Sequence, residues 1–223
     1  MTSVHITRIP QMDAGWLPEL IPFLNGRVKD KIRRMRRRED QLRSAAVHAI
    51  AQMMLAKQLN VHIADLHYTV NEYGKYGLAG NQLYFNLSHA GCYVACAISH
   101  CPVGIDLEER TKREFNLFSS IWSEIEKNQY DLQDRDCFYW LWTAKESYIK
   151  YLGIGLYAPM KQITVLGDGS VIDEGRKAKA VIEHLALDQN YTFAVCSEQK
   201  INHINVIELD TIRTFYQRND RLE

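Results

Sequence analysis

The stretch WTAKESYIKYLGIGL at residues 142–156 is the most informative part of this chain of 223 residues. Its apolar side chains belong to a longer helical pattern, which predicts a buried helix over 134–152 that ends at Gly153. Glu146 and Lys150 are four residues apart, so they are neighbours on one face of this helix. Taken alone, the pair is also compatible with an exposed ion pair that contributes little to stability.

The composition is that of an ordinary globular protein, with 46% hydrophobic and 24% charged residues and a formal net charge of zero. The five cysteines form no CxxC pair, which argues against a disulfide framework or a zinc site and fits a reducing cytoplasm. No apolar run approaches the roughly 20 residues that span a bilayer, and the N-terminus lacks the pattern of a signal peptide. We therefore expect a cytoplasmic protein with no membrane partner.

Charge is unevenly divided along the chain. Residues 1–103 carry 12 Lys and Arg against 7 Asp and Glu, whereas residues 104–223 carry 15 against 20. A basic half joined to an acidic half is compatible with a phosphate-rich ligand on one side and a cation on the other. It is equally compatible with two halves that neutralise each other across an internal interface.

The hydrophobic pattern predicts a helical block and a small sheet in each half of the chain, which is an α+β fold. Besides the helix over 134–152, we expect helices at 40–59, at 115–130 and from Asp210 onward. Strands are expected at 4–9, 66–70, 83–87, 93–99, 103–108, 163–166, 178–184, 191–197 and 205–208, with a glycine-containing loop at 71–80.

Three carboxylates are candidate metal ligands. Asp106 and Glu108 are two residues apart on a predicted strand, so their side chains leave the strand on the same face. With Glu146 they form the kind of oxygen-rich set that holds Mg²⁺ together with water and substrate phosphates. The alternative for the strand pair is a solvated acidic strand end.

Ser88 and His89 lie where a predicted strand ends in a turn, so a hydroxyl and an imidazole are available there for phosphate oxygens. The same pair could suggest a serine nucleophile with its base. Against that interpretation, adjacent residues of a strand point to opposite faces, and the chain contains no G-x-S-x-G motif.

A basic run extends over residues 29–43. It could bind nucleic acid through phosphates, it could be a solvated helix face, or a few members, chiefly Lys31 and Arg43, could reach a terminal phosphate of a nucleotide. Few aromatic residues interleave with the basic ones, which weakens the nucleic-acid interpretation.

The ordered segments FNLSHAG at 85–91, VGIDLE at 103–108 and the helix at 142–156 resemble those of the Sfp-type 4′-phosphopantetheinyl transferases, and the match spans about 29–156. Arg43 fits the end of the basic helix of that family. The family's Gly-Lys-Pro loop is represented by Lys75 followed by Tyr76 in place of proline.

The resemblance implies two similar α+β subdomains with pseudo-twofold symmetry, residues 1–103 and residues 104–223, and a ligand site between them in a monomer. It also implies an enzyme, a holo-[carrier protein] synthase. This enzyme would move 4′-phosphopantetheine from coenzyme A to a serine hydroxyl of an apo acyl or peptidyl carrier protein. The carrier would serve fatty-acid, polyketide or non-ribosomal peptide synthesis, and adenosine 3′,5′-bisphosphate would be released.

By the same resemblance, Mg²⁺ is the cofactor and the site residues have distinct roles. The nucleotide side of coenzyme A would contact Lys31, Arg43, Lys75, Ser88 and His89. The metal would be held by Asp106, Glu108 and Glu146, with Glu146 also taking the serine proton and Lys150 serving the leaving phosphate. A nucleic-acid-binding module that uses the basic 29–43 helix and a metal-dependent nucleotide phosphohydrolase remain as alternatives.

Overall fold

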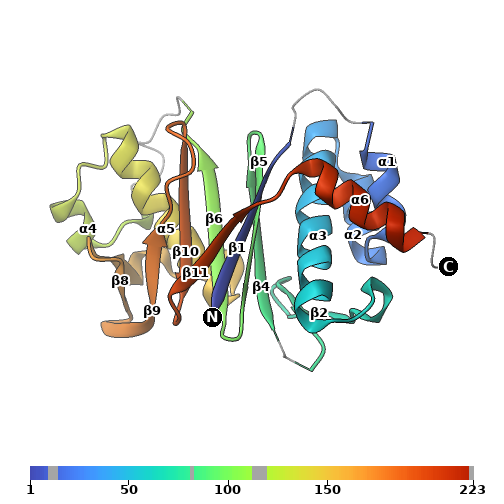
Figure 1. Ribbon diagram of the computed structural model, residues 1–223. Coiled ribbons are helices and arrows are strands. Elements are labelled where there is room, and N and C mark those ends of the chain that lie inside the picture. The colour runs from blue at the N-terminus through green and yellow to red at the C-terminus, as the bar shows by residue number, and fades with distance from the viewer. Residues whose placement is uncertain (10–14, 81–82, 112–119, 221–223) are drawn as a thin grey trace.

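Two sheets lie face to face in the middle of the molecule, and helices cover the outer face of each, so the layers run helix, sheet, sheet, helix (Figure 1). The computed structural model describes residues 1–9, 15–80, 83–111 and 120–220. This is the α+β architecture that the sequence predicts. None of the described helices has the length and apolar character to cross a bilayer.

The first sheet has the strand order β11–β1–β5–β4, and the second has the order β6–β10–β9–β8–β7. Strand β11 runs parallel to β1, and the other described pairs within these two sheets are antiparallel. A separate two-stranded hairpin pairs β2 with β3. The strands are β1 Thr2–Arg8, β2 Tyr68–Val70, β3 Tyr76–Leu78, β4 Tyr84–Ala90, β5 Tyr93–Ser99, β6 Val103–Glu109, β7 Ile163–Val165, β8 Ser170–Asp173, β9 Arg176–His184, β10 Tyr191–Ser197 and β11 Ile201–Val206.

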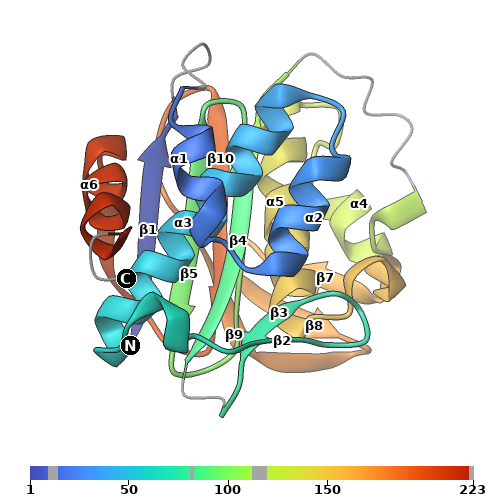
Figure 2. The same cartoon turned by 90° about the vertical axis from the view of Figure 1, so that its right-hand side faces the viewer.

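Two long helices form the outer layers. Helix α3 packs on β4 and β5 and is itself covered by α1, α2 and α6, while α5 packs on β6 and β10 (Figure 2). The helices are α1 Leu17–Leu20, α2 Gly26–Arg34, α3 Arg38–Leu59, α4 Glu124–Gln129, α5 Arg135–Leu152 and α6 Leu209–Asp220. Short 3₁₀ turns lie at Ile21–Phe23, Ile63–Asp65, Gly155–Tyr157 and Met160–Gln162.

The apolar core falls into three clusters that match these layers. One lies between α3 and the first sheet, one lies between α5 and the second sheet, and one fills the space between the two sheets. Val4 and Ile6 of β1 meet Ile105 of β6 and Phe193 of β10 in this central cluster, and all four are nearly inaccessible to water. Because each strand buries alternate residues on this inner face, the two sheets cannot slide without exposing it.

Most predicted elements occur within about two residues of their expected limits, and the exceptions have local causes. The predicted loop at 71–80 contains β3, the final strand lies at Ile201–Val206 instead of 205–208, and β8 was not predicted. Part of the helix expected at 115–130 lies outside the described residues, and α4 occupies Glu124–Gln129. These strands are short or exposed, so their hydrophobic alternation is weak.

The end of the chain packs against its beginning. Strand β11 returns to pair with β1, and α6 packs against α1 and α3. Hydrogen bonds reinforce this return, since Tyr216 donates its hydroxyl to Gln52 and contacts the carbonyl oxygen of Ala49. Segments distant in the chain thus form a parallel strand pair, and the division of the chain at residue 103 stays a prediction.

Helix α5 approaches β6 so closely that a side chain does not fit between them at Gly104. A Cβ atom on Gly104 would lie 1.9 Å from the carbonyl oxygen of Ser147 and 2.3 Å from the backbone nitrogen of Tyr151. The contact sets the height of α5 above the strand, and with it the position of Glu146 relative to Asp106.

We expect Gly104→Ala to lower the free energy of unfolding by about 3 kcal/mol, since the added methyl group forces helix and strand apart. Gly26→Ala is the matched control, because no heavy atom lies within 4 Å of its Cβ position. Urea unfolding of both variants measures the difference. Equal and small effects would show that α5 does not rest on β6 at this point.

Candidate active site

The two sheets join at strands β4 and β6, which belong to different sheets and are bridged by side chains. Asn86 Oδ1 accepts a hydrogen bond from the backbone nitrogen of Ile105 at 2.9 Å, and Ser88 Oγ accepts one from that of Leu107 at 3.1 Å. Alternate residues of one strand thus satisfy alternate N–H groups of the other. Asp106 lies between the two bonds and is held against the first sheet.

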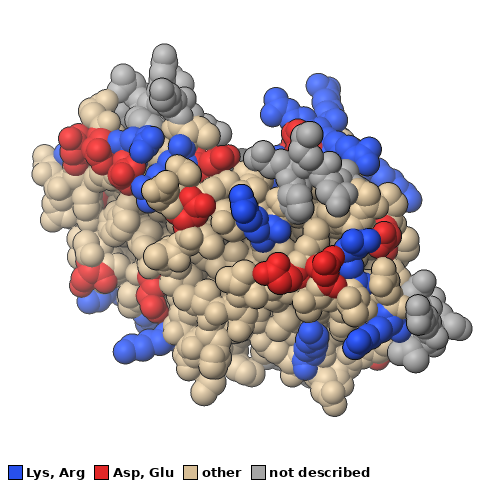
Figure 3. All heavy atoms as spheres, turned by 45° about the horizontal axis from the view of Figure 1, so that its top comes forward, with Lys and Arg blue, Asp and Glu red and all other residues tan. Residues whose placement is uncertain are grey.

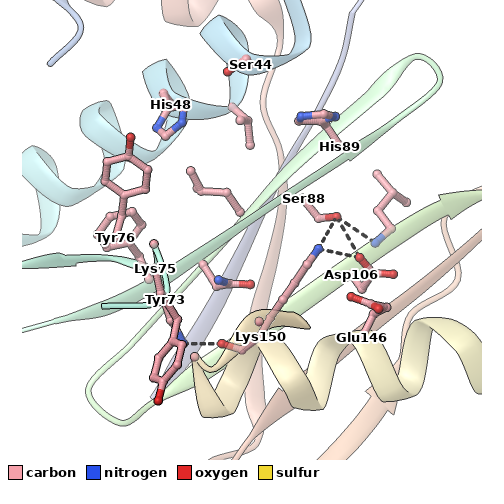
Figure 4. A pocket seen from close by; sticks show the side chains of 18 of the residues that line it. Ser44, His48, Tyr73, Lys75, Tyr76, Ser88, His89, Asp106, Glu146 and Lys150 are labelled. Atoms are coloured by element: carbon pink, nitrogen blue, oxygen red, sulfur yellow. Dashed lines mark hydrogen bonds and ion pairs between the residues drawn. The ribbon is translucent and has the colours of Figure 1, made fainter. Parts of the chain in front are cut away.

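A cleft of about 510 Å³ opens over this join, between α3 of one lobe and α5 of the other (Figure 4). It is lined by Lys31, Ser44, Val47, His48, residues 73–76, residues 85–89, residues 106–108, Trp142, Glu146, Lys150, Gly153 and Gly155. Eight of the nine site residues expected from the sequence are in this lining, and Arg43 is the exception. Segments distant in the chain therefore meet at one cavity.

One end of the cleft is built around Asp106, whose side chain is only 6% exposed. Its Oδ1 pairs with the Lys150 ammonium at 2.6 Å and accepts a hydrogen bond from Ser88 Oγ at 3.3 Å. Lys150 also donates to Ser88 Oγ at 3.2 Å. Asp106 Oδ2 is buried and has no hydrogen-bond partner in the described part of the chain.

Glu146 and Glu108 add two carboxylates to this end. Desolvation, together with the negative charges of Asp106 and Glu108, raises the pKa of Glu146 from 4.5 to about 7, although Lys150 acts in the opposite direction. Glu108 Oε1 accepts a hydrogen bond from Trp142 Nε1 at 3.1 Å, which fixes it to the first turn of the 142–156 stretch. Glu146 is therefore poised to exchange a proton near neutral pH.

The other end of the cleft carries cations. Desolvation and the positive charges of Arg43, Lys150 and Lys31 lower the pKa of His89 to about 4, although the ring keeps an exposed edge. Lys31 is exposed on α2, whereas Arg43 is half-buried and holds Asp40 at 2.6 Å and the carbonyl oxygen of Gly91 at 3.1 Å. An anion that enters this end meets the exposed Lys31 ammonium and a neutral imidazole, and Arg43 adds positive charge from outside the cleft lining.

Ser88 and His89 lie on opposite sides of β4 (Figure 4). Ser88 Oγ is committed to Asp106, Lys150 and the backbone of Leu107. It therefore belongs to the acidic end with Asp106 and Lys150, because side chains alternate along a strand and His89 leaves β4 on the other side. The same alternation leaves Ser88 without an imidazole base from His89, as expected from the sequence.

Lys75 also lies differently from the expected phosphate contact. Its ammonium donates to the carbonyl oxygens of Val103 and Tyr151, each at 3.1 Å, and to that of Lys150. Asn71 of the same loop donates to the carbonyl oxygen of Gly153 at 2.8 Å. The loop thus caps the C-terminus of α5, where carbonyl groups lack helical partners, and the three protons of the ammonium are all engaged.

The basic run forms two helices instead of the single 29–43 helix that the sequence suggested. Helix α2 ends at Arg34 and α3 begins at Arg38, with Met35 in an extended conformation between them. Most Lys and Arg side chains of the run are exposed, and Figure 3 shows basic side chains projecting from the side of the molecule that carries these helices. Only Lys31 of this run lines the cleft.

Some residues of the site were not singled out from the sequence. Asn86 bridges the sheets, Trp142 holds Glu108, and His48 contacts Tyr76 edge-on with ring centroids 5.3 Å apart. Asn86 stood in the quoted FNLSHAG segment, and an alternating pair of polar residues in an otherwise apolar strand was the available signal. The partners of Trp142 and His48 lie on other elements, so spacing alone does not reveal them.

The carboxylates of Asp106, Glu108 and Glu146 line one end of the cleft but do not form a complete metal-coordination site. Among the described residues, no group of three or more His, Cys, Asp or Glu side chains is arranged to hold a metal ion. The unpaired buried oxygen of Asp106 and the raised pKa of Glu146 nevertheless mark a place where negative charge is under-compensated. Hard carboxylate oxygens of this kind fit Mg²⁺.

Sequence comparisons relate this chain to known proteins. The model of the 4′-phosphopantetheinyl transferase superfamily matches residues 102–196, which include β6 and α5. A 4′-phosphopantetheinyl transferase of Bacillus subtilis is 30% identical over 196 residues, which cover 83% of this chain and 87% of that protein. The 4′-phosphopantetheinyl transferase Sfp of Bacillus subtilis strain 168 is 29% identical over 184 residues, covering 78% of this chain and 82% of that protein.

A further relative is the 4′-phosphopantetheinyl transferase gsp of Aneurinibacillus migulanus, 29% identical over 166 residues that cover 71% of this chain and 70% of that protein. The similarity thus extends over both lobes and the cleft between them. The chain belongs to the 4′-phosphopantetheinyl transferase family and is a transferase enzyme.

Glu146→Gln should change how stability depends on pH in a metal-free buffer with EDTA. The folded-state pKa of Glu146 lies above its unfolded value, so its stabilising contribution is complete below pH 4.5 and is lost as pH rises through about 7. Allowing for solvent screening, we expect the variant to be more stable than the wild type by about 1–2 kcal/mol at pH 8, with a smaller difference at pH 5. Thermal unfolding measures this, with the exposed Glu208→Gln as control. A difference that does not depend on pH would contradict the raised pKa.

Lys75→Met should lower the free energy of unfolding by about 2–3 kcal/mol, since buried carbonyl groups lose a charged donor. Coenzyme A affinity should change less than about threefold, because the ammonium points at α5 and not into the cleft. Urea unfolding and calorimetric titration measure the two effects, with the exposed Lys179→Met as control. If Lys75→Met instead has normal stability and strongly weakened coenzyme A binding, the result would support the phosphate contact of Lys75 that the sequence led us to expect.

Proposed function

We propose that this enzyme transfers 4′-phosphopantetheine from coenzyme A to a serine hydroxyl of an apo acyl or peptidyl carrier protein, in a Mg²⁺-dependent reaction that releases adenosine 3′,5′-bisphosphate. The observation that carries the proposal is the polarity of one cleft. Its acidic end is formed by β6 and α5, and its cationic end lies beside β4 and α2. Membership of the transferase family supports the reaction class.

The cationic end suits the 3′-phosphate of coenzyme A. Lys31 projects into the cleft as a mobile point charge, and His89 gains a favourable partner for its proton when a phosphate arrives. Arg43 adds positive potential from outside the cleft lining. It also fixes the turn after β4, because its guanidinium donates a hydrogen bond to the carbonyl oxygen of Gly91. The pyrophosphate of the same ligand then extends toward Lys150.

The acidic end suits the reacting groups. In the transfer, the serine oxygen forms a bond to the phosphorus that carries pantetheine, and the bond from that phosphorus to the bridging oxygen of the nucleotide breaks. Glu146 takes the hydroxyl proton, since its carboxylate lies at the end of the cleft that also holds Asp106 and Lys150. The Lys150 ammonium stabilises negative charge as it develops on the leaving phosphate.

Asp106, Glu108 and Glu146 would hold Mg²⁺ beside the pyrophosphate. When bound, the ion supplies charge neutralisation and orientation for the phosphate oxygens. Ser88 contributes by fixing Asp106, since its hydroxyl joins that carboxylate to the backbone of β6. Trp142 does the same for Glu108.

The decisive test is the mass of an apo carrier protein after incubation with enzyme, coenzyme A and Mg²⁺. We expect a gain equal to the phosphopantetheine arm with at least one member of a panel of acyl and peptidyl carriers. Glu146→Gln should slow the transfer by about 100-fold or more, as expected for loss of a general base, when kcat is measured at saturating coenzyme A and Mg²⁺. Glu208→Gln again serves as control.

Release of phosphopantetheine or phosphate in the absence of any carrier, with no gain in carrier mass, would instead indicate a metal-dependent nucleotide phosphohydrolase. Wild-type rates in Glu146→Gln would remove this residue from the proton transfer while leaving the overall reaction in place.

A further inference from the structure

The Lys150 ammonium forms an ion pair with the buried carboxylate of Asp106. It contacts Asp106 Oδ1 at 2.6 Å and Ser88 Oγ at 3.2 Å, and its side chain is 28% exposed against 6% for Asp106. The ammonium thus reaches inward from the cleft to a carboxylate that water hardly reaches. Such a pair is held by charge, since removal of either partner leaves a poorly solvated ion behind.

The ammonium reaches only one oxygen of the Asp106 carboxylate. It contacts Oδ1, while Oδ2 is buried and has no hydrogen-bond partner among the described residues. Glu108 and Glu146 line the same end of the cleft. A divalent cation that enters there meets oxygen donors from three carboxylates, one of which already holds the ammonium.

We propose that Lys150 is an exchangeable placeholder: its ammonium occupies the Asp106 carboxylate until a divalent cation displaces it, and it then turns to the phosphates of the bound substrate. This inference rests on the proposed Mg²⁺-dependent function and adds a sequence of events to it. One residue thereby serves two anions in turn.

The exchange follows from electrostatics and from the length of the lysine side chain. A divalent cation and an ammonium repel each other strongly when both contact one carboxylate in a desolvated site. The side chain of Lys150 has several rotatable bonds, so its ammonium can leave Asp106. The backbone of Lys150 stays in place, because its carbonyl oxygen accepts a hydrogen bond from the Lys75 ammonium. Ser88 Oγ then keeps its bonds to Asp106 and to the backbone of Leu107.

The exchange couples the two ligands. A metal ion alone must displace Lys150 and therefore binds weakly, whereas a phosphate ligand that receives the ammonium reduces that cost. By reciprocity, the metal must then strengthen phosphate binding by the same factor. Removal of Lys150 should consequently tighten binding of the metal alone, which a purely structural role of this lysine does not predict.

The first experiment measures the affinity of the phosphate-free protein for Mn²⁺ by electron paramagnetic resonance. We expect Lys150→Met to bind about tenfold more tightly than the wild type, the effect of removing one competing ion-pair contact. Lys31→Met is the matched control, since it removes a cleft cation with no described bond to these carboxylates, and its Mn²⁺ affinity should stay near that of the wild type. Asp106→Asn should lose binding.

Unchanged or weaker Mn²⁺ binding by Lys150→Met would overturn the inference. An equal gain in Lys31→Met would also overturn it, because the effect would then be general electrostatics and not exchange. Failure of both the wild type and Lys150→Met to bind Mn²⁺ at millimolar concentration would show that no cation exchanges with the lysine.

A second measurement uses the wild type and does not depend on the folding of a variant. Brief treatment with acetic anhydride, followed by peptide mass spectrometry, reports the reactivity of each lysine. Mg²⁺ should increase acetylation of Lys150 several-fold, because its amine leaves the carboxylate. The exposed Lys179 should react equally with and without the ion, and the buried Lys145 should stay unreactive.

Acetylation of Lys150 that is unchanged or reduced by Mg²⁺ would contradict the exchange. Neither measurement contains coenzyme A or a carrier protein, so failure here leaves the transfer reaction intact. Failure of the proposed function itself would be seen only as an unmodified carrier protein.

Discussion

The bridge between β4 and β6 is the contact on which the site depends. Among the strands of the described residues, β6 has no neighbour at this edge of its sheet, and Asn86 and Ser88 supply the acceptors that a strand would otherwise provide. A buried N–H group without an acceptor costs about 1–3 kcal/mol, so the two side chains set the register of the lobes. Asp106, between the two bonded residues, is thereby carried to the floor of the cleft while remaining part of a regular strand.

Helix α5 must be held as firmly as β6, since it carries Glu146 and Lys150. Contact at Gly104 fixes the distance of α5 from β6. The hydrogen bonds from the Lys75 ammonium to the carbonyl oxygens of Val103 and Tyr151 hold the C-terminal turn of the helix against the strand. On the far side, the fully buried Lys145 pairs with Glu126 at 2.7 Å and also donates to three carbonyl oxygens. The neighbouring residues Lys145 and Glu146 therefore lie on different faces of α5: Lys145 anchors the helix and Glu146 lines the cleft.

Sequence reasoning was reliable where periodicity decided the geometry and failed where distant segments meet. The two-residue spacing of Asp106 and Glu108 predicts one face of a strand, and the four-residue spacing of Glu146 and Lys150 predicts one face of a helix. All four residues line the cleft. The same rule, applied strictly to β4, separates Ser88 from His89. No local pattern shows that Lys75 reaches the end of α5, or that β11 pairs with β1. These contacts join residues far apart in the chain, and hydrophobic periodicity reports only on neighbouring residues.

The two ends of the cleft each hold one group in a less charged form than usual. At the acidic end, burial and the charges of Asp106 and Glu108 raise the pKa of Glu146 to about 7, so its negative charge is partly suppressed near neutral pH. At the cationic end, burial and the charges of Arg43, Lys150 and Lys31 lower the pKa of His89 to about 4, so the ring is neutral. The protein thereby avoids part of the repulsion that fully charged groups would cause at either end.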